Sequence, residues 1–162
     1  IKNLNRFGSK YELVLGNSLD LPNLIPGTSH RIIHIDGSHQ YEVVRNDLQN
    51  ALNLLSQEGV IILDDYSNFM YPGVARAFWE FYENTHLQII CATHSRIYLT
   101  QNKYVPQYKL TLERLSLQQS PVSFGPAEDG TFNLVTFKKS KNLIQKVYSL
   151  LSLIALGVSR IR

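Results

Sequence analysis

The sequence predicts an α/β domain with a Rossmann-like, mainly parallel sheet flanked by helices. Strand-like runs alternate with helical ones, the clearest helix lies between two such runs, and the run at 60–63 is apolar throughout. A strand that is covered on both faces has this continuous apolar pattern. The alternation is typical of right-handed crossover connections, which place helices on both faces of the sheet.

The first half of the chain supplies most of the regular pattern. Residues 11–15 (YELVL) and 31–36 (RIIHID) are predicted to be strands. The segment 21–30 between them carries two prolines and a glycine, which indicates a loop or one irregular turn. Apolar residues at helical spacing predict a helix over 41–55, with Ser38 as its N-cap.

The second half is less regular. Its predicted elements are a strand at 60–63, a helix that starts at Pro72, a hairpin at 87–92 and 96–100, a strand at 131–137 and a helix at 141–156. Proline suits the first position of a helix. Residues 103–130 have no pattern that predicts an element.

Charge is unevenly distributed along the 162 residues, whose formal net charge is +3. Residues 138–162 contain six basic and no acidic residues, so residues 1–137 hold 10 basic against 13 acidic residues, a net of −3. The positive charge therefore belongs to a tail, and we expect no nucleic-acid partner. We expect a domain at 1–139 and a basic amphipathic helix at 140–162, for which contact with an anionic membrane surface is the minor alternative.

Cysteine usage and hydropathy bear on the compartment. Cys91 is the one cysteine, which excludes an intrachain disulfide and favours a reducing, cytoplasmic location. The longest uncharged apolar-rich run, 147–158, has 12 residues. A helix that spans a bilayer needs about 20.

Acidic residues follow two of the predicted strands, Asp36 after one and Asp64-Asp65 after the other. Ligands of such sheets bind outside the carboxyl ends of the strands, and neighbouring strands lie about 4.8 Å apart. Carboxylates so close need a proton, a basic side chain or a cation, and oxygen ligands favour Mg²⁺, Mn²⁺ or Ca²⁺. The alternative is that Asp36-Gly37 forms a turn and that Asp64 or Asp65 caps the next segment.

Two histidines lie close to Asp36 in the sequence. His39, three residues later, is a candidate metal ligand, general base or surface residue. His34, two residues earlier, shares the face of Asp36 and is interpreted as a core or supporting residue rather than a ligand.

Aromatic side chains follow the aspartate pair: Tyr66, Phe69, Tyr71 and Trp79. Aromatic residues on a loop over a strand end would suit an apolar acceptor. For Trp79 the preferred interpretation is a core residue.

Four motifs occur in a fixed order: LVLGNS at 13–18, HIDGSHQYEVVRNDL at 34–48, EGVIILDDY at 58–66 and YPGVARAFWEF at 71–81. Together they resemble the class I S-adenosylmethionine-dependent methyltransferases. Within that class the chain is most similar to the cation-dependent O-methyltransferases, namely the catechol-type enzymes and methyltransferase family 24. The resemblance covers roughly residues 11 to 102.

The resemblance implies a role for each matching residue. The divalent-cation ligands, most readily of Mg²⁺, would be Asp36, Asp64 and Asp65. The residues beside the adenine end of S-adenosylmethionine would be Gly16, Asn17, Ser18 and Asp36, although the family often has Asp where Asn17 stands. His39 would be the base that removes the proton of the acceptor hydroxyl.

The family also has a glycine-rich cofactor loop and an acidic ribose partner, both before the region that starts here at Tyr11. No Gly-x-Gly sequence occurs in the 162 residues, and the first residue is Ile1 rather than methionine. We therefore expect the later part of a methyltransferase domain, which binds S-adenosylmethionine weakly or not at all.

The resulting expectation is an S-adenosylmethionine-dependent, divalent-cation-assisted O-methyltransferase that acts on a small-molecule hydroxyl. Sugars, phenols and polyketide-type hydroxyls all fit, and a homo-oligomer is compatible with the sequence. One alternative is a metal-dependent hydrolase that uses Asp36, His39, Asp64 and Asp65. The other is a non-catalytic remnant or interaction module.

Overall fold

The computed structural model of the chain describes residues 13–25, 27, 29–118, 122–128 and 130–137. In chain order the elements are η2 (Ser18–Asp20), α1 (Leu21–Leu24), β1 (His30–Ile35), α2 (Tyr41–Leu54), β2 (Leu55–Leu63), α3 (Pro72–Glu83), β3 (Leu87–Ala92), β4 (Ile97–Gln101), η3 (Asn102–Tyr104), α4 (Val105–Gln118), β5 (Val122–Pro126) and β6 (Asn133–Phe137).

The strands form a 6-stranded sheet in the order β1-β2-β4-β3-β6-β5. β1 is parallel to β2 and β3 is parallel to β6, whereas β4 is antiparallel to both β2 and β3, and β5 is antiparallel to β6. β1, β2, β3 and β6 therefore point in one direction. The predicted α/β class is confirmed, and the two reversed strands arise because hairpins return the chain along its own neighbour.

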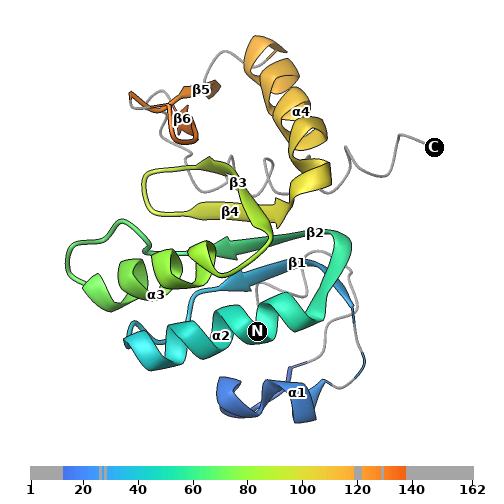
Figure 1. Cartoon of the computed structure of the whole chain (residues 1–162), viewed down its shortest axis with the longest axis vertical. Coiled ribbons are helices and arrows are strands. Elements are labelled where there is room, and N and C mark those ends of the chain that lie inside the picture. The colour runs from blue at the N-terminus through green and yellow to red at the C-terminus, as the bar shows by residue number, and fades with distance from the viewer. Residues whose placement is uncertain (1–12, 26, 28, 119–121, 129, 138–162) are drawn as a thin grey trace.

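Helices cover both faces of the sheet, with α2 and α3 on one side and α4 on the other (Figure 1). The alternation of side chains along β2 divides the core accordingly. Ile61 and Leu63 join the cluster under α2 and α3, and Val60 and Ile62 join the cluster under α4. The apolar run at 60–63 is thus buried on both faces, as its composition predicted.

Several predicted elements need correction. No strand forms within residues 13–15, the described part of the predicted strand at 11–15. Gln40, not Ser38, is the N-cap of α2. The Ser38 hydroxyl oxygen accepts the N–H of Gln40 (3.2 Å), which precedes the first helical residue, so Ser38 does not cap an N–H of the helix itself. The unassigned stretch 103–130 contains α4 and β5.

Two further expectations concern the membrane and the C-terminus. Among the described helices, none combines the length and the apolar character that crossing a bilayer requires. The helix predicted at 140–162 lies outside the described residues.

Candidate active site

The register of three adjacent strands gathers charged side chains at one edge of the sheet. Ile35 and Leu63, the last residues of β1 and β2, are register partners, and the N–H of Asp64 donates to the carbonyl of Ile35 (3.0 Å). Asp36 and Asp64 therefore leave neighbouring strand ends together. β4 starts opposite the end of β2, which brings Arg96 to the other side of Asp64.

Asp64 is held by Arg96. The Nε and Nη2 atoms of Arg96 both contact one oxygen of Asp64, Oδ2, at 2.8 and 2.7 Å. The other oxygen, Oδ1, accepts the backbone N–H of Asp65 (3.0 Å). Burial alone would raise the pKa of Asp64, but the Arg96 guanidinium and this N–H hold the pKa below its ordinary value.

His34, Asp36 and Asp64 form a set of potential metal ligands. One donor atom of each lies within 4.8 Å of the others, and Nε2 of His34 is 3.7 Å from Oδ2 of Asp64. The two carboxylates offer the oxygen ligands that Mg²⁺ and Mn²⁺ prefer, so they fit the cation that the resemblance implies, with the imidazole as a third donor. The interpretation of His34 as a core residue is wrong, because 39% of its side chain is exposed to solvent at this edge of the sheet.

Asp65 points away from this set. Its φ angle is 56°, a left-handed conformation that aspartate tolerates better than most residues, and it turns the chain sharply after β2. Oδ2 of Asp65 lies 3.0 Å from Nε2 of His39, and Oδ1 accepts a hydrogen bond from Nδ2 of Asn68 (3.1 Å). Of the three aspartates predicted as ligands, the structure groups Asp36 and Asp64, whereas Asp65 pairs with His39.

His39 is fixed from two further sides. Its ring stacks on the ring of Tyr71, with centroids 3.8 Å apart and planes at 12°. A Cβ on Gly73 would lie 2.9 Å from the His39 carbonyl oxygen and 3.0 Å from the Tyr41 nitrogen. The glycine after Pro72 is therefore what lets α3 begin against the start of α2.

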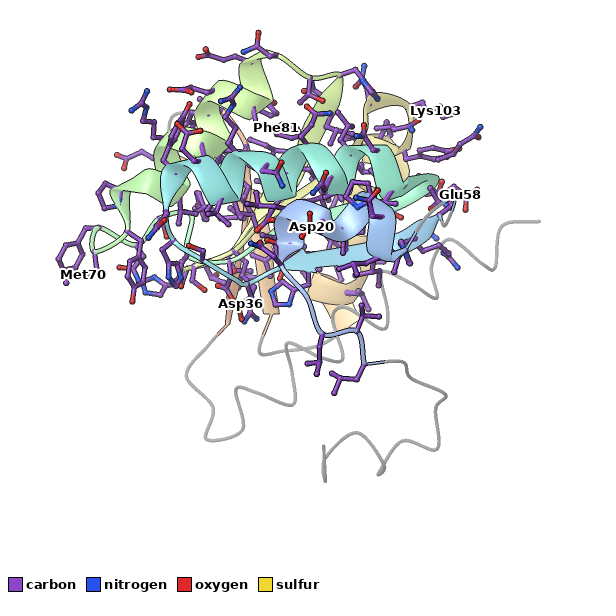
Figure 2. All side chains as sticks on the ribbon, turned by 90° about the horizontal axis from the view of Figure 1, so that it is seen from below. Asp20, Asp36, Glu58, Met70, Phe81 and Lys103 are labelled. Carbon is purple, nitrogen blue, oxygen red and sulfur yellow. The ribbon has the colours of Figure 1, made fainter. Side chains whose placement is uncertain are left out.

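The aromatic residues predicted near the site have different positions. Tyr66 packs edge-on against buried Phe78. Phe69 lies on the loop after β2 and is 88% exposed. Met70, on the same loop, lies at the opposite end of the molecule from Glu58 (Figure 2). The expectation of a core position for Trp79 is wrong: the side chain is 42% exposed, because α3 directs the preceding Phe78 toward the sheet.

The Gly16-Asn17-Ser18 turn is hydrogen-bonded to α2. Oδ1 of Asn17 caps η2 by accepting the N–H of Leu19 (3.1 Å), and Nδ2 of Asn50 donates to the Ser18 carbonyl (3.0 Å). Burial raises the pKa of Asp47, although a hydrogen bond with the Ser18 side chain lowers it in part. A Cβ on Gly37 would lie 3.8 Å from Oδ2 of Asp47, so this carboxyl lies close to the segment after Asp36.

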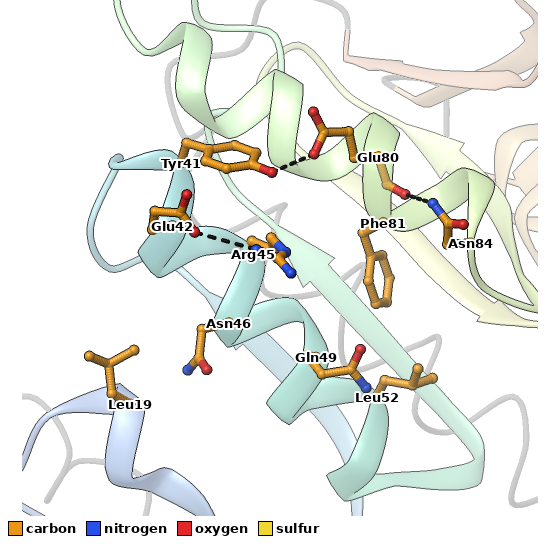
Figure 3. A pocket seen from close by; sticks show the side chains of 10 residues that line it. All are labelled: Leu19, Tyr41, Glu42, Arg45, Asn46, Gln49, Leu52, Glu80, Phe81 and Asn84. Carbon is orange, nitrogen blue, oxygen red and sulfur yellow. Dashed lines mark hydrogen bonds and ion pairs between the residues drawn. The ribbon is translucent and has the colours of Figure 1, made fainter.

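A cavity lies away from these residues. A pocket of about 870 Å³ opens between α2 and α3, with Leu19 of η2 at its rim (Figure 3). Its charged groups are satisfied by neighbours: Glu42 by Arg45 at 3.5 Å and Glu80 by the hydroxyl of Tyr41 at 2.5 Å. None of the predicted site residues lines it.

Sequence reasoning missed Arg96, Asn68 and Asp47. Arg96 is far from the aspartates in sequence and adjoins Asp64 only because β4 runs antiparallel to β2. Asn68 and Asp47 carry no spacing signal either. Only knowledge of the strand register could have placed Arg96 there.

The sequence and the fold were compared with known proteins. Residues 2–66 match a family model described as a methyltransferase domain. No curated protein sequence matches the chain. The solved O-methyltransferase NovP is 23% identical with a TM-score of 0.50, covering 62% of this chain and 42% of that one. CalS11, a TDP-rhamnose 3'-O-methyltransferase of calicheamicin biosynthesis, is 18% identical with a TM-score of 0.45, covering 55% and 41%.

The chain spans about two fifths of the length of these solved structures. The family match begins nine residues before Tyr11 and ends at Tyr66, just after the Asp64-Asp65 pair. The likeness to NovP bears on the fold alone. The resemblance to methyltransferases, first indicated by four short motifs, is therefore confirmed as a match of residues 2–66 to the model of a methyltransferase domain.

Proposed function

We propose that the chain is part of a cytoplasmic, S-adenosylmethionine-dependent O-methyltransferase that acts on a small-molecule hydroxyl. One observation carries the proposal: an imidazole–carboxylate pair, His39 and Asp65, lies at the same sheet edge as a cation-type donor set. Ligands of doubly wound sheets bind at this edge. The family match over residues 2–66 selects methyl transfer among the reactions that such an edge could support.

The donor set would hold a divalent cation through His34, Asp36 and Asp64. A bound cation lowers the pKa of an acceptor hydroxyl and orients it. Asp65, which the resemblance places among the ligands, is assigned a different role here, because its two oxygens contact His39 and Asn68.

His39 is the proposed general base. Asp65 accepts a hydrogen bond from Nε2–H of His39 and so favours the tautomer whose free lone pair is on Nδ1. Nδ1 then takes the proton of the acceptor hydroxyl, and Asp65 stabilises the imidazolium that forms. The stacked ring of Tyr71 limits rotation of the imidazole, so the base stays oriented.

S-Adenosylmethionine, when bound, supplies the methyl group as an electrophilic sulfonium. Its adenine end would lie at Gly16, Asn17, Ser18 and Asp36. The hydrogen bond from Asn50 of α2 to the Ser18 carbonyl fits such a role, since it orders the turn before a ligand binds. These residues would contact one end of the cofactor, which agrees with the expectation of weak binding by the 162 residues alone.

The test is methyl transfer from labelled S-adenosylmethionine to a panel of sugar, phenol and polyketide-type hydroxyls, using protein expressed from the complete gene. We expect transfer that depends on a divalent cation and is lost in Asp64→Asn. Binding of cation and cofactor without transfer to any acceptor would favour a non-catalytic module. A calorimetric titration should also show no micromolar affinity of the 162 residues for the cofactor.

A metal-dependent hydrolase stays a second candidate because the structure adds His34 to the acidic residues. A hydrolase of this kind needs histidine ligands on neighbouring strands, and His34 on β1 is one. Cation-dependent hydrolysis of ester or phosphate substrates without methyl transfer would favour this candidate.

A further inference from the structure

We propose that Arg96 is a built-in competitor of the divalent cation, so that guanidinium and cation exclude each other at Oδ2 of Asp64. The inference rests on the proposed cation site but not on methyl transfer. It assigns a function to Arg96, the arginine that the strand register places beside Asp64.

The two oxygens of Asp64 have different partners. Oδ1 accepts the Asp65 N–H, whereas Oδ2 is the oxygen that faces His34 at 3.7 Å. Oδ2 is therefore the atom that a cation shared with His34 would contact. The same oxygen receives both Nε and Nη2 of Arg96, at 2.8 and 2.7 Å.

The charges at this edge also favour competition between Arg96 and a cation. Asp36 and Asp64 carry two negative charges, and the guanidinium of Arg96 neutralises one of them. A divalent cation placed among these groups would meet a like charge a few ångströms away, a repulsion of several kcal/mol near a protein surface (about 4 kcal/mol for unit charges at 4 Å).

The side chain of Arg96 has room to move away from Asp64. Its backbone is held in the turn before β4, where its carbonyl accepts the Thr93 N–H (2.7 Å) and its N–H donates to Oγ1 of Thr93 (3.2 Å). Its side chain, by contrast, is 27% exposed, against 11% for Asp64. The guanidinium can therefore swing toward water while the strand stays in register, and Asp64 keeps its position for the cation.

The experiment measures Mn²⁺ affinity by calorimetry and by the electron paramagnetic resonance signal of free Mn²⁺. The proteins are the unmodified chain, Arg96→Gln, Arg96→Lys and the control Arg45→Gln, which removes a surface arginine paired with Glu42 on α2. We expect Arg96→Gln to bind about tenfold more tightly or better, Arg96→Lys to lie between, and Arg45→Gln to match the unmodified chain.

A second measurement needs no substitution. During titration of the unmodified chain with Mg²⁺, the Nε–H resonance of Arg96 should move toward the position of a solvent-exposed arginine. If Arg96→Gln does not fold, this resonance and Arg96→Lys decide the question.

The proposal is overturned if the Arg96 variants bind Mn²⁺ no more tightly than the unmodified chain, or if Mg²⁺ binds while the Arg96 resonance stays in place. The two proposals fail separately. Tighter binding by Arg96→Gln in a protein that transfers no methyl group would remove the proposed function alone. Cation-dependent transfer with equal affinities would remove the competition alone.

Discussion

Asp64 and Asp65 are adjacent in the sequence, but their side chains contact different parts of the fold. Asp64 lies between β1 and β4, where it contacts Arg96 and His34. Asp65 turns toward the start of α2, where it contacts His39. Each carboxylate is thus compensated by a different kind of group, a permanent cation on one side and a titratable imidazole on the other.

The difference teaches that an Asp-Asp pair at a strand end need not act as one unit. The register between β2 and β4 sets the neighbours of Asp64, and the left-handed backbone of Asp65 sets its own. The proposed function places the cation on the Asp64 side and the general base on the Asp65 side. Substitutions that affect one side and spare the other test this division.

The largest effect is expected on the Asp65 side, from His39→Gln in the complete protein. Loss of a general base reduces kcat about 10²- to 10⁴-fold, while Mn²⁺ affinity should stay unchanged because His39 is outside the donor set. Rates with labelled cofactor and a cation titration measure the two quantities. The control is His86→Gln, an exposed histidine before β3. A matching loss of cation affinity would show that the two sides are one site.

Gly73→Ala should disturb the backbone around His39, on the Asp65 side of the site. The added Cβ would meet the His39 carbonyl oxygen at 2.9 Å, and backbone cannot give way as a flexible side chain can. We expect a loss of about 1–3 kcal/mol in the free energy of unfolding, measured in urea. In Gly125→Ala the new Cβ has no atom within 4 Å, so the stability should change by less than about 0.5 kcal/mol. Equal losses in the two variants would contradict the close approach.

Arg96→Gln should lower stability on the Asp64 side. It removes two charge-assisted contacts from a carboxylate that is mostly buried, and the expected cost is about 1–2 kcal/mol. Arg45→Gln breaks a pair on the surface of α2, with a cost of about 0–0.5 kcal/mol. Chemical denaturation of both variants measures the difference. A cost for Arg96→Gln no greater than for Arg45→Gln would mean that water compensates Asp64 as well as Arg96 does.

Helical spacing and apolar runs were sufficient to predict α2, α3, β1 and the buried part of β2, because each pattern reports local burial. The position of Asp36 beside Asp64 followed from the rule that parallel strands end at one edge. Asp65 turns away from Asp64 because its φ angle is left-handed. Arg96 lies beside Asp64 because β4 pairs antiparallel with β2. Neither leaves a trace in residue spacing, so the sequence predicted that Asp36 and Asp64 lie close together but did not predict that Arg96 contacts Asp64.

The smallest effect concerns acid pH and compares Asp64 with Asp47, whose pKa values shift in opposite directions. Because the folded pKa of Asp64 is lowered, Asp64 stabilises the fold above the unfolded value of about 3.9, and this contribution is lost as the pH falls through the folded pKa. Asp47, whose folded pKa is raised by burial, has the opposite effect: stability falls as its carboxyl ionises on the way to neutral pH. Asp64→Asn should therefore flatten the rise in unfolding free energy below about pH 4, and Asp47→Asn should remove a loss of stability that sets in above about pH 4. Urea unfolding at stepped pH measures both slopes, and slopes that change in the same direction would show that Arg96 does not dominate the charge state of Asp64.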